Sequence, residues 1–309
     1  MRHEHTVMRF CSLLSIAAVS SAFALAAAAQ NEVAGDWDQA GGGIFGFQEE
    51  FIDRGGGPDL GDYAGLPIND ALRYKASLYS PSWLTVPEHQ CLPHPGVYAY
   101  RSPGGLSIVK EYDPATQRLV AYRFYGSYGL ARVVWMDGRP HPPANAIHSW
   151  SGFSTAEWDG DTLVVTTTHL KEGYLRRSGL MRSDQAVVRE RWRRMGDYLQ
   201  MTSINYDPVM MTEPYIRSTM MWVLDPALSM SPYPCEEATE TAIPRGTVPH
   251  FLPGKSPLPG LDKNLTDRFG TPYEPRLGGA ATMYPEYIAK MKTMPKPPKV
   301  ATGATEGGN

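Results

Sequence analysis

The stretch STAEWDGDTLVVTTTHL, residues 154–170, decides the fold that this sequence predicts. Two runs with the composition of β-strands meet at Asp159-Gly160. This dipeptide accepts the positive φ angles that a two-residue hairpin turn requires. We therefore expect a β-hairpin in which Trp158 pairs with Asp161 across the turn.

Other stretches show the same pattern of strand, turn and strand. Residues 108–125 should turn at 113–116, where Pro114 presets φ, and residues 187–206 should turn at 195–197. Residues 131–139 and 214–224 add two more strands. Apolar residues nowhere recur at helical spacing for four turns. The sequence thus predicts an all-β fold, an antiparallel meander closed into a barrel, with a β-sandwich as the alternative.

The two ends of the chain differ from this central region. Arg2 and Arg9 precede an apolar run at 13–26 that ends in small residues, the pattern of a secretory signal cut near Ala29. The run is too short for a membrane span, so we expect a periplasmic or secreted protein. The expected organisation is a signal peptide at 1–29, a barrel domain with a glycine-rich N-terminal loop at 30–235, an irregular Pro-rich extension packed on the barrel at 236–293, and a disordered tail at 294–309. Short helices are predicted at 68–78 and 284–292.

The sequence contains three cysteines, of which Cys11 falls inside the predicted signal peptide. Cys91 and Cys235 remain as an even pair in an oxidising compartment, which favours a disulfide between them. Two buried free thiols are the alternative.

Charge argues against a nucleic-acid partner. The formal net charge is -3, whereas phosphate binding requires a clustered basic face. One basic cluster is present at 189–194, and strand alternation assigns its arginines to a solvated outer face. We therefore expect neither a nucleic-acid partner nor a membrane role, and the sequence predicts no oligomeric state.

The same alternation carries Glu190 inward, in one row with Val188 and Trp192. An unpaired carboxylate inside a barrel is a usable general acid or base. The alternative is a structural ion pair, with Arg123 or Arg132 as the partner. Glu111 poses the same question on a strand whose inward face the pattern does not identify.

The motif DGRPHP, residues 137–142, combines an acid, a cation and an imidazole. Asp137-Gly138 forms turns readily, and the flanking prolines hold His141 on a stiff loop, where it could act as an acid or base. The alternative is a structural loop. His148 and His169 follow at spacings that match no compact zinc signature, so no metal site is predicted.

Four stretches together resemble a large family of exported bacterial β-rich proteins, in which a DGR-x-HP segment precedes a W-x-GDTLVV hairpin and later E-R and DP elements. They lie at 132–142, 152–170, 187–194 and 204–215, and the resemblance covers roughly 90–224. It implies no particular reaction. It draws attention to Arg132, Asp137, Arg139, His141, Trp158, Asp161, Glu190 and Asp207. GDW at 35–37 is also similar to the Gly-x-Trp of lipocalins.

These patterns lead to a hypothesis about function. We expect the barrel to enclose a small apolar or aromatic molecule and to bind or convert it. In the enzymatic version His141 and Glu190 act as acid and base without cofactor or metal, in an isomerase, cyclase, hydratase or lyase. The expected substrate-binding residues are Glu111, Arg123, Arg132, Asp137, Arg139 and Trp192. The alternatives are a non-catalytic lipocalin-like binding protein and an envelope interaction protein.

Overall fold

The computed structural model describes residues 32–39, 61–78, 91–94, 96–101, 105–126, 129–176, 179–230, 246, 251–252, 254–256, 258–264 and 270–295. The predicted signal peptide, Cys235 and the tail beyond residue 295 lie outside these ranges. The predictions made for them, including the disulfide, therefore stay predictions.

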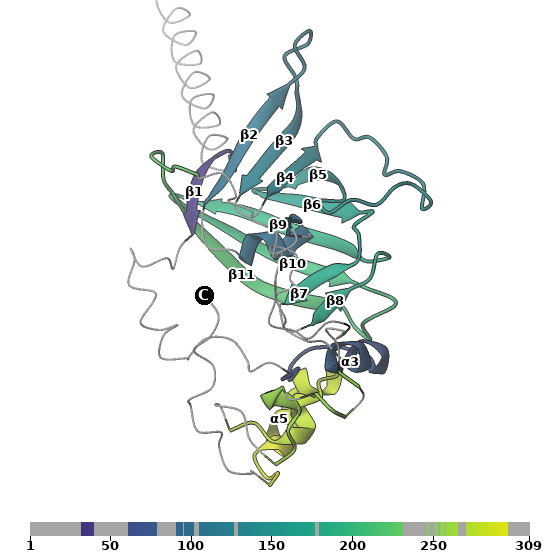
Figure 1. Ribbon diagram of the computed structural model, residues 1–309. Coiled ribbons are helices and arrows are strands. Elements are labelled where there is room, and N and C mark those ends of the chain that lie inside the picture. Colours follow the sequence, from purple (N-terminus) through teal and green to yellow (C-terminus); the bar gives the residue numbers. More distant parts are fainter. Residues whose placement is uncertain are drawn as a thin grey trace, which may run out of the picture.

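Within the described residues the main sheet is a closed nine-stranded barrel (Figure 1), so the predicted all-β barrel is confirmed. Strand β1 closes the barrel by pairing with β11 on one side and β2 on the other. Around the barrel the strands are β1 (Gly35–Gln39), β11 (Tyr215–Leu224), β10 (Tyr198–Tyr206), β9 (Val187–Met195), β6 (Thr162–Thr168), β5 (Phe153–Asp159), β4 (Leu130–Trp135), β3 (Leu119–Gly126) and β2 (Leu106–Tyr112).

The barrel departs from a simple antiparallel meander at one place. Strands β4 and β5 are parallel, with Val134 opposite Ser154 and Trp135 opposite Thr155. Parallel neighbours require a long crossover connection, and residues 136–152, which include DGRPHP, supply it. Asp137-Gly138 therefore begins a crossover and does not form a hairpin turn. A second small sheet, β7 (Gly173–Arg176) with β8 (Leu180–Arg182), lies between β6 and β9 in the chain.

The β5–β6 hairpin forms, but its turn lies one residue later than expected. Asp159 pairs with Thr162, and Trp158 pairs with Leu163 instead of Asp161. Gly160 has a φ of 60°, the positive value that the first position of a primed two-residue turn needs. The turn is therefore centred on the glycine and the residue after it.

The two other predicted hairpins are confirmed. Between β2 and β3, the Asp113 carboxylate accepts hydrogen bonds from the backbone N–H groups of Ala115 at 2.9 Å and Thr116 at 2.7 Å. Between β9 and β10, Met195 pairs with Tyr198, and Gly196 takes a φ of 63°. Both turns use the side-chain and backbone chemistry that the sequence indicates.

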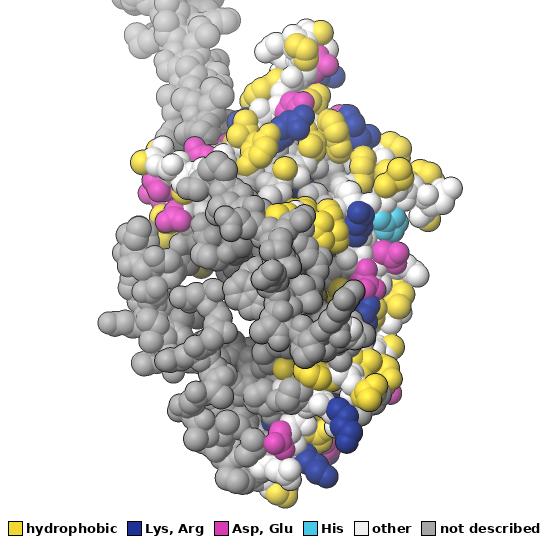
Figure 2. Space-filling model, viewed as in Figure 1, with side chains coloured by type: hydrophobic (Ala, Val, Ile, Leu, Met, Phe, Trp, Pro, Cys, Tyr) yellow, Lys and Arg dark blue, Asp and Glu magenta, His cyan; other side chains and the backbone are white. Residues whose placement is uncertain are grey.

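The outer face of β9 carries the arginines of the predicted basic cluster. Exposure alternates along the strand, with Arg189, Arg191 and Arg193 exposed and Glu190 and Trp192 buried. Arg191 pairs with Asp159 and Arg193 with Asp161. On the face shown in Figure 2, acidic and basic side chains likewise lie beside one another and do not gather into a patch of one sign.

Helix α3 (Asp70–Ser77) confirms the first predicted helix, and its N-cap Asn69 accepts a hydrogen bond from the N–H of Leu72 at 2.9 Å. The second is α5 (Pro285–Met291), which follows α4 (Tyr273–Arg276), η5 (Ala280–Met283) and, earlier, η4 (Pro259–Leu261). None of the described helices has the length and apolar character needed to span a bilayer.

The C-terminal extension packs beside α3, at the end of the barrel near β7 and β8 (Figure 1). Arg73 of α3 donates to the carbonyl of Leu277 at 2.6 Å, and the N–H of Tyr63 donates to the carbonyl of Arg276 at 2.8 Å. The extension touches the barrel where Tyr284 donates to Glu213 in the β10–β11 connection. Most of these contacts of the C-terminal extension are thus with the segment around α3.

Side chains of the 3-10 helix η3 (Gly96–Arg101) enter the barrel. The Tyr100 ring lies edge-on to Trp192 at 5.3 Å and to Trp222 at 6.1 Å, and Trp192 also contacts Phe124 at 5.3 Å. These four aromatic rings are buried. The middle of the barrel is therefore a packed core closed by η3.

Two glycines flank β5, and both have a positive φ. Comparing them separates the free energy lost through backbone strain from the free energy lost through steric contact of an added Cβ. Gly152 and Gly160 have φ values of 69° and 60°. A Cβ at Gly152 would meet the carbonyl oxygen of Thr168 at 2.6 Å, whereas a Cβ at Gly160 would meet nothing within 4 Å.

We expect Gly160→Ala to lower the free energy of unfolding by about 1–2 kcal/mol through backbone strain alone. Gly152→Ala should cost about 1–3 kcal/mol more, because backbone atoms must also move. Urea denaturation of both variants measures the difference. Equal destabilisation would show that the contact at Gly152 is easily relieved.

Candidate functional site

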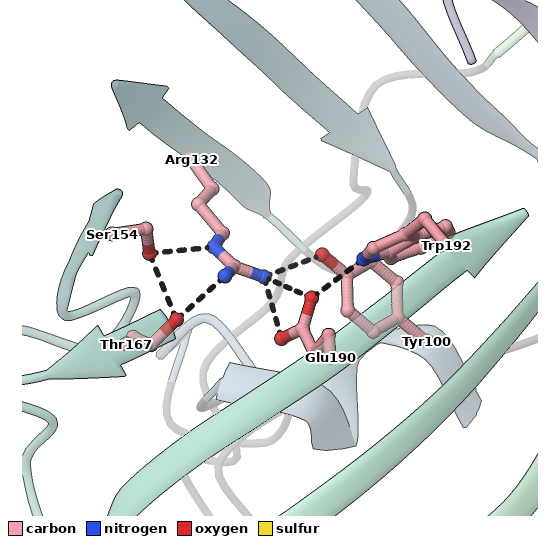
Figure 3. A network of polar contacts seen from close by, with 6 residues as sticks. All are labelled: Tyr100, Arg132, Ser154, Thr167, Glu190 and Trp192. Atoms are coloured by element: carbon pink, nitrogen blue, oxygen red, sulfur yellow. Dashed lines mark hydrogen bonds and ion pairs between the residues drawn. The ribbon is translucent and has the colours of Figure 1, made fainter. Parts of the chain in front are cut away.

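A buried polar network crosses the middle of the barrel, centred on Arg132 of β4 (Figure 3). Its Nε donates to Ser154 at 3.0 Å, and its Nη2 donates to Thr167 at 2.6 Å. Its Nη1 donates to the Tyr100 hydroxyl at 2.9 Å and to the Glu190 carboxylate at 2.8 Å. All three guanidinium nitrogens are therefore engaged by inward-facing side chains.

Glu190 is the counter-charge of this network. Its side chain is 1% exposed, and besides Arg132 it accepts a hydrogen bond from the indole Nε1 of Trp192 at 2.9 Å. Because side chains two residues apart share a strand face, β9 presents Glu190 and Trp192 to the interior together. The structure thus shows the ion-pair alternative for Glu190, with Arg132 rather than Arg123 as the partner.

The electrostatics of this network favour a fixed pair of charges. Burial opposes the charge of Arg132, but the Glu190 carboxylate and the Tyr100 hydroxyl outweigh it and hold the pKa of Arg132 above its ordinary value. Burial also raises the pKa of the Tyr100 hydroxyl, which stays neutral. Without the Glu190 carboxylate the buried guanidinium of Arg132 would have no counter-charge, which is costly. Glu190 and Arg132 therefore form a buried ion pair in this structure.

His141 lies on the other side of the barrel wall. Its Nδ1 is 2.7 Å from the hydroxyl of Thr168, its Nε2 is 2.9 Å from the hydroxyl of Thr155, and its ring lies edge-on to Phe153 at 5.2 Å. These partners alternate along β5 and β6 with side chains that face the interior. Because the crossover passes outside the barrel, His141 and Glu190 lie on opposite faces of the barrel wall, and the acid and base roles predicted for them stay predictions.

The other two histidines of the region hold the same crossover. His169 approaches the Thr168 hydroxyl through Nδ1 at 2.7 Å and the Pro143 carbonyl through Nε2 at 2.9 Å. His148 contacts the Leu170 carbonyl at 3.1 Å and lies against the His169 ring at 5.2 Å. Among the described residues, no three His, Cys, Asp or Glu side chains meet in an arrangement that could hold a metal ion.

Asp137 and Arg139 form an ion pair at the start of the crossover. The Arg139 guanidinium donates to both Asp137 oxygens, at 2.9 and 3.0 Å from Nε, and lies 3.4 Å from the centre of the Trp135 ring. The hydrogen bond from Arg139 holds the pKa of Asp137 below its ordinary value. These two predicted binding residues are thus on the outside of the barrel.

Glu111 and Arg123 also face outward, paired with each other. The Arg123 Nη2 donates to the Glu111 carboxylate at 3.0 Å, and both side chains are partly exposed. This pair settles the direction of Glu111, which the sequence pattern left open. The predicted binding residues therefore fall into three groups: Arg132 and Trp192 inside, Asp137 and Arg139 on the crossover, and Glu111 and Arg123 on the outer face of β2 and β3.

A second buried polar group lies toward the barrel end near β8, and the sequence reasoning singled out only its member Asp207. Ser203 and Asn205 of β10 are 1% and 0% exposed, and Arg182 of β8 is 0% exposed. The Asp207 carboxylate accepts bonds from the N–H of Ser183 at 2.6 Å and from its hydroxyl at 2.8 Å. These bonds join the residue after Arg182 to the residue two beyond Asn205, so the end of β8 lies beside the end of β10.

Several atoms of this group have no hydrogen-bond partner among the described residues. They are the Ser203 hydroxyl, both amide atoms of Asn205, and Nε and Nη2 of Arg182. The pattern that could have identified them was present in residues 198–206, where alternation continues the inward row of Leu199 and Met201 into Ser203 and Asn205. Buried polar groups are normally paired, so this row is unlike the satisfied network around Arg132.

No family model, curated protein or solved structure matches the chain. The resemblance to exported β-rich proteins with DGR-x-HP and W-x-GDTLVV segments therefore stays a prediction. The class that the structure itself defines is a closed β-barrel with a packed polar and aromatic interior.

The Arg132–Glu190 pair should contribute strongly to folding. Glu190→Gln should lower the free energy of unfolding by about 3–5 kcal/mol, because it leaves a buried charge unpaired. The double variant Arg132→Met with Glu190→Gln should be less destabilised than the sum of the single changes. Denaturant unfolding in a double-mutant cycle measures this coupling.

The outer Arg123–Glu111 pair is the matched control, because water screens it. Arg123→Met and Glu111→Gln should have much smaller effects and little coupling. Similar coupling energies in the two cycles would contradict the role assigned to burial.

The pKa of His141 lies below its ordinary value, chiefly because of burial and secondly because of the nearby His169. A lowered pKa means that the folded protein prefers neutral His141. Its contribution to stability is therefore present above the unfolded pKa of about 6.5 and is lost as pH falls below it. His141→Gln should show a smaller drop in Tm between about pH 7.5 and about pH 5.5 than the parent protein. An equal or larger drop in the variant would show that His141 does not titrate in this way.

Proposed function

We propose that this protein binds a small organic molecule inside the barrel, at the end formed by Ser203 and Asn205. The observation that carries the proposal is the set of unpartnered polar atoms on these two fully buried side chains. A buried polar group without a partner costs about 1–3 kcal/mol. A bound molecule with its own donors and acceptors would recover that free energy.

The surroundings of this row suit a molecule with an apolar or aromatic body. Ser203 lies opposite Glu190, and Asn205 lies between Val188 on β9 and Tyr215 on β11. The aromatic cluster of Trp192 and its neighbours continues the same interior. Pockets that combine apolar walls with a few directed polar groups are typical of small-molecule binding.

Binding fits this geometry better than catalysis. The two residues expected to act as acid and base lie on opposite sides of the barrel wall, and Glu190 is committed to Arg132. The amide and hydroxyl of Asn205 and Ser203 orient a molecule by hydrogen bonds but are weak proton donors and acceptors. With the predicted signal peptide and the predicted Cys91–Cys235 disulfide, the proposal describes an exported binding protein.

Asn205→Leu tests the proposal, because leucine fills a similar volume without polar atoms. Without ligand, its free energy of unfolding should be unchanged or higher by about 1 kcal/mol, since an unpaired amide is removed. Ser154→Ala is the control, because it removes a hydroxyl that is hydrogen-bonded, and it should be destabilising. Benzamide, which has an aromatic body and an amide head, should raise the Tm of the parent protein and not that of Asn205→Leu.

Two results would contradict the proposal. One is a destabilised Asn205→Leu variant, which would mean that the amide is satisfied in the folded protein. The other is an identical response of parent and variant to benzamide.

A further inference from the structure

Arg182 lies on β8 at the same end of the barrel and differs from Arg132, whose guanidinium nitrogens are all engaged. The Nη1 of Arg182 donates to the carbonyl of Lys171 at 2.7 Å. Its Nε and Nη2 are buried and have no hydrogen-bond partner among the residues that the structure describes. These two nitrogens share one edge of the planar guanidinium, so their N–H groups form an intact fork of the kind that binds a carboxylate with two parallel hydrogen bonds.

No carboxylate of the described residues occupies that fork. The negative charge of Asp207 acts on Arg182. The oxygens of Asp207, however, accept hydrogen bonds from Ser183 and from the N–H groups of Val209 at 2.9 Å and Met210 at 3.0 Å. Burial lowers the pKa of Arg182 to about 10, against the opposing charges of Asp207 and Glu172. A buried guanidinium normally has an anion in direct contact, as Arg132 has in Glu190.

Gly96 lies close against Nη2 of Arg182. A Cβ at this position would lie 3.2 Å from Nη2 and 3.4 Å from the nearest carbon of Leu170. Only a glycine at this position leaves Nη2 uncrowded, because a methyl group here would press against it. The N–H of Gly96 is already bonded to the carbonyl of Trp150 at 2.9 Å, so the guanidinium supplies the donors.

We propose that Arg182 binds the carboxylate of a small organic monoanion, whose body extends along the row of Asn205 and Ser203. The inference rests on the proposed function and names the head group of the molecule bound there. A single negative charge fits, because Glu190 already neutralises Arg132 and Arg182 supplies one positive charge. A carboxylate oxygen also accepts from the Asn205 amide, whose nitrogen is unpartnered.

The test compares acids with their amides. Isothermal titration uses two pairs of probes, formate with formamide and benzoate with benzamide, in buffer of matched ionic strength. Benzoate should bind at least about tenfold more tightly than benzamide, and formate more tightly than formamide, because only the acids form charge-assisted bonds with the fork. Arg182→Gln should remove this preference, and Arg182→Lys, which keeps the charge but loses the fork, should retain only part of it.

A second variant covers the case in which Arg182→Gln fails to fold. Gly96→Ala places a methyl group beside Nη2 and should weaken benzoate binding, whereas Gly160→Ala, with a similar φ and open space, should not. Amides that bind as tightly as the acids would overturn the carboxylate inference and leave the proposed function standing. Acids that bind with the same preference to Arg182→Gln or Gly96→Ala would overturn the assignment to Arg182. Failure of both acids and amides to bind, together with a destabilised Asn205→Leu, would overturn the proposed function as well.

Discussion

The buried pair of Arg132 and Glu190 is the interaction on which the interior of this barrel depends. One guanidinium joins side chains from β4, β5, β6, β9 and η3, strands and a helix that are distant in sequence. A charge at this depth is tolerable only when its partner and its hydrogen bonds are all in place. The network therefore specifies how η3 enters the barrel and how the hairpins face one another, because each element supplies a partner that the others cannot replace.

The same physical rule distinguishes the middle of the interior from the end near β8. Around Arg132 every nitrogen is engaged, and the aromatic rings of Tyr100 and Trp192 seal the network from water. Within the described part of the chain, two nitrogens of Arg182 have no hydrogen-bond partner, and neither do the polar atoms of Ser203 and Asn205 on β10. Satisfied polar groups hold a fold together, whereas buried and unsatisfied ones are tolerated where a ligand completes them. This contrast locates the candidate site at the barrel end near β8.

The barrel wall also separates Arg132 and His141, which are only nine residues apart in the sequence. Strand alternation sends Ser154 and Thr167 inward and Thr155 and Thr168 outward, so Arg132 and His141 contact the same two strands from opposite sides. The imidazole holds the crossover between the parallel strands β4 and β5 against the outside of the barrel. In this structure DGRPHP is part of the connection between β4 and β5, which lie parallel within an otherwise antiparallel sheet.

The sequence by itself determined the local features of this protein. The all-β class, the three hairpins, the two short helices and the inward direction of Glu190 and Trp192 all follow from turn chemistry and from the two-residue period of a strand, which act between near neighbours. Tertiary structure alone decided that β4 and β5 are parallel, that Glu190 meets Arg132, that His141 lies outside, and that Arg182 comes to the same end as Asn205. These outcomes depend on which strands become neighbours when the sheet closes. Strand alternation predicts whether a side chain faces inward or outward, but it does not predict which residue that side chain contacts.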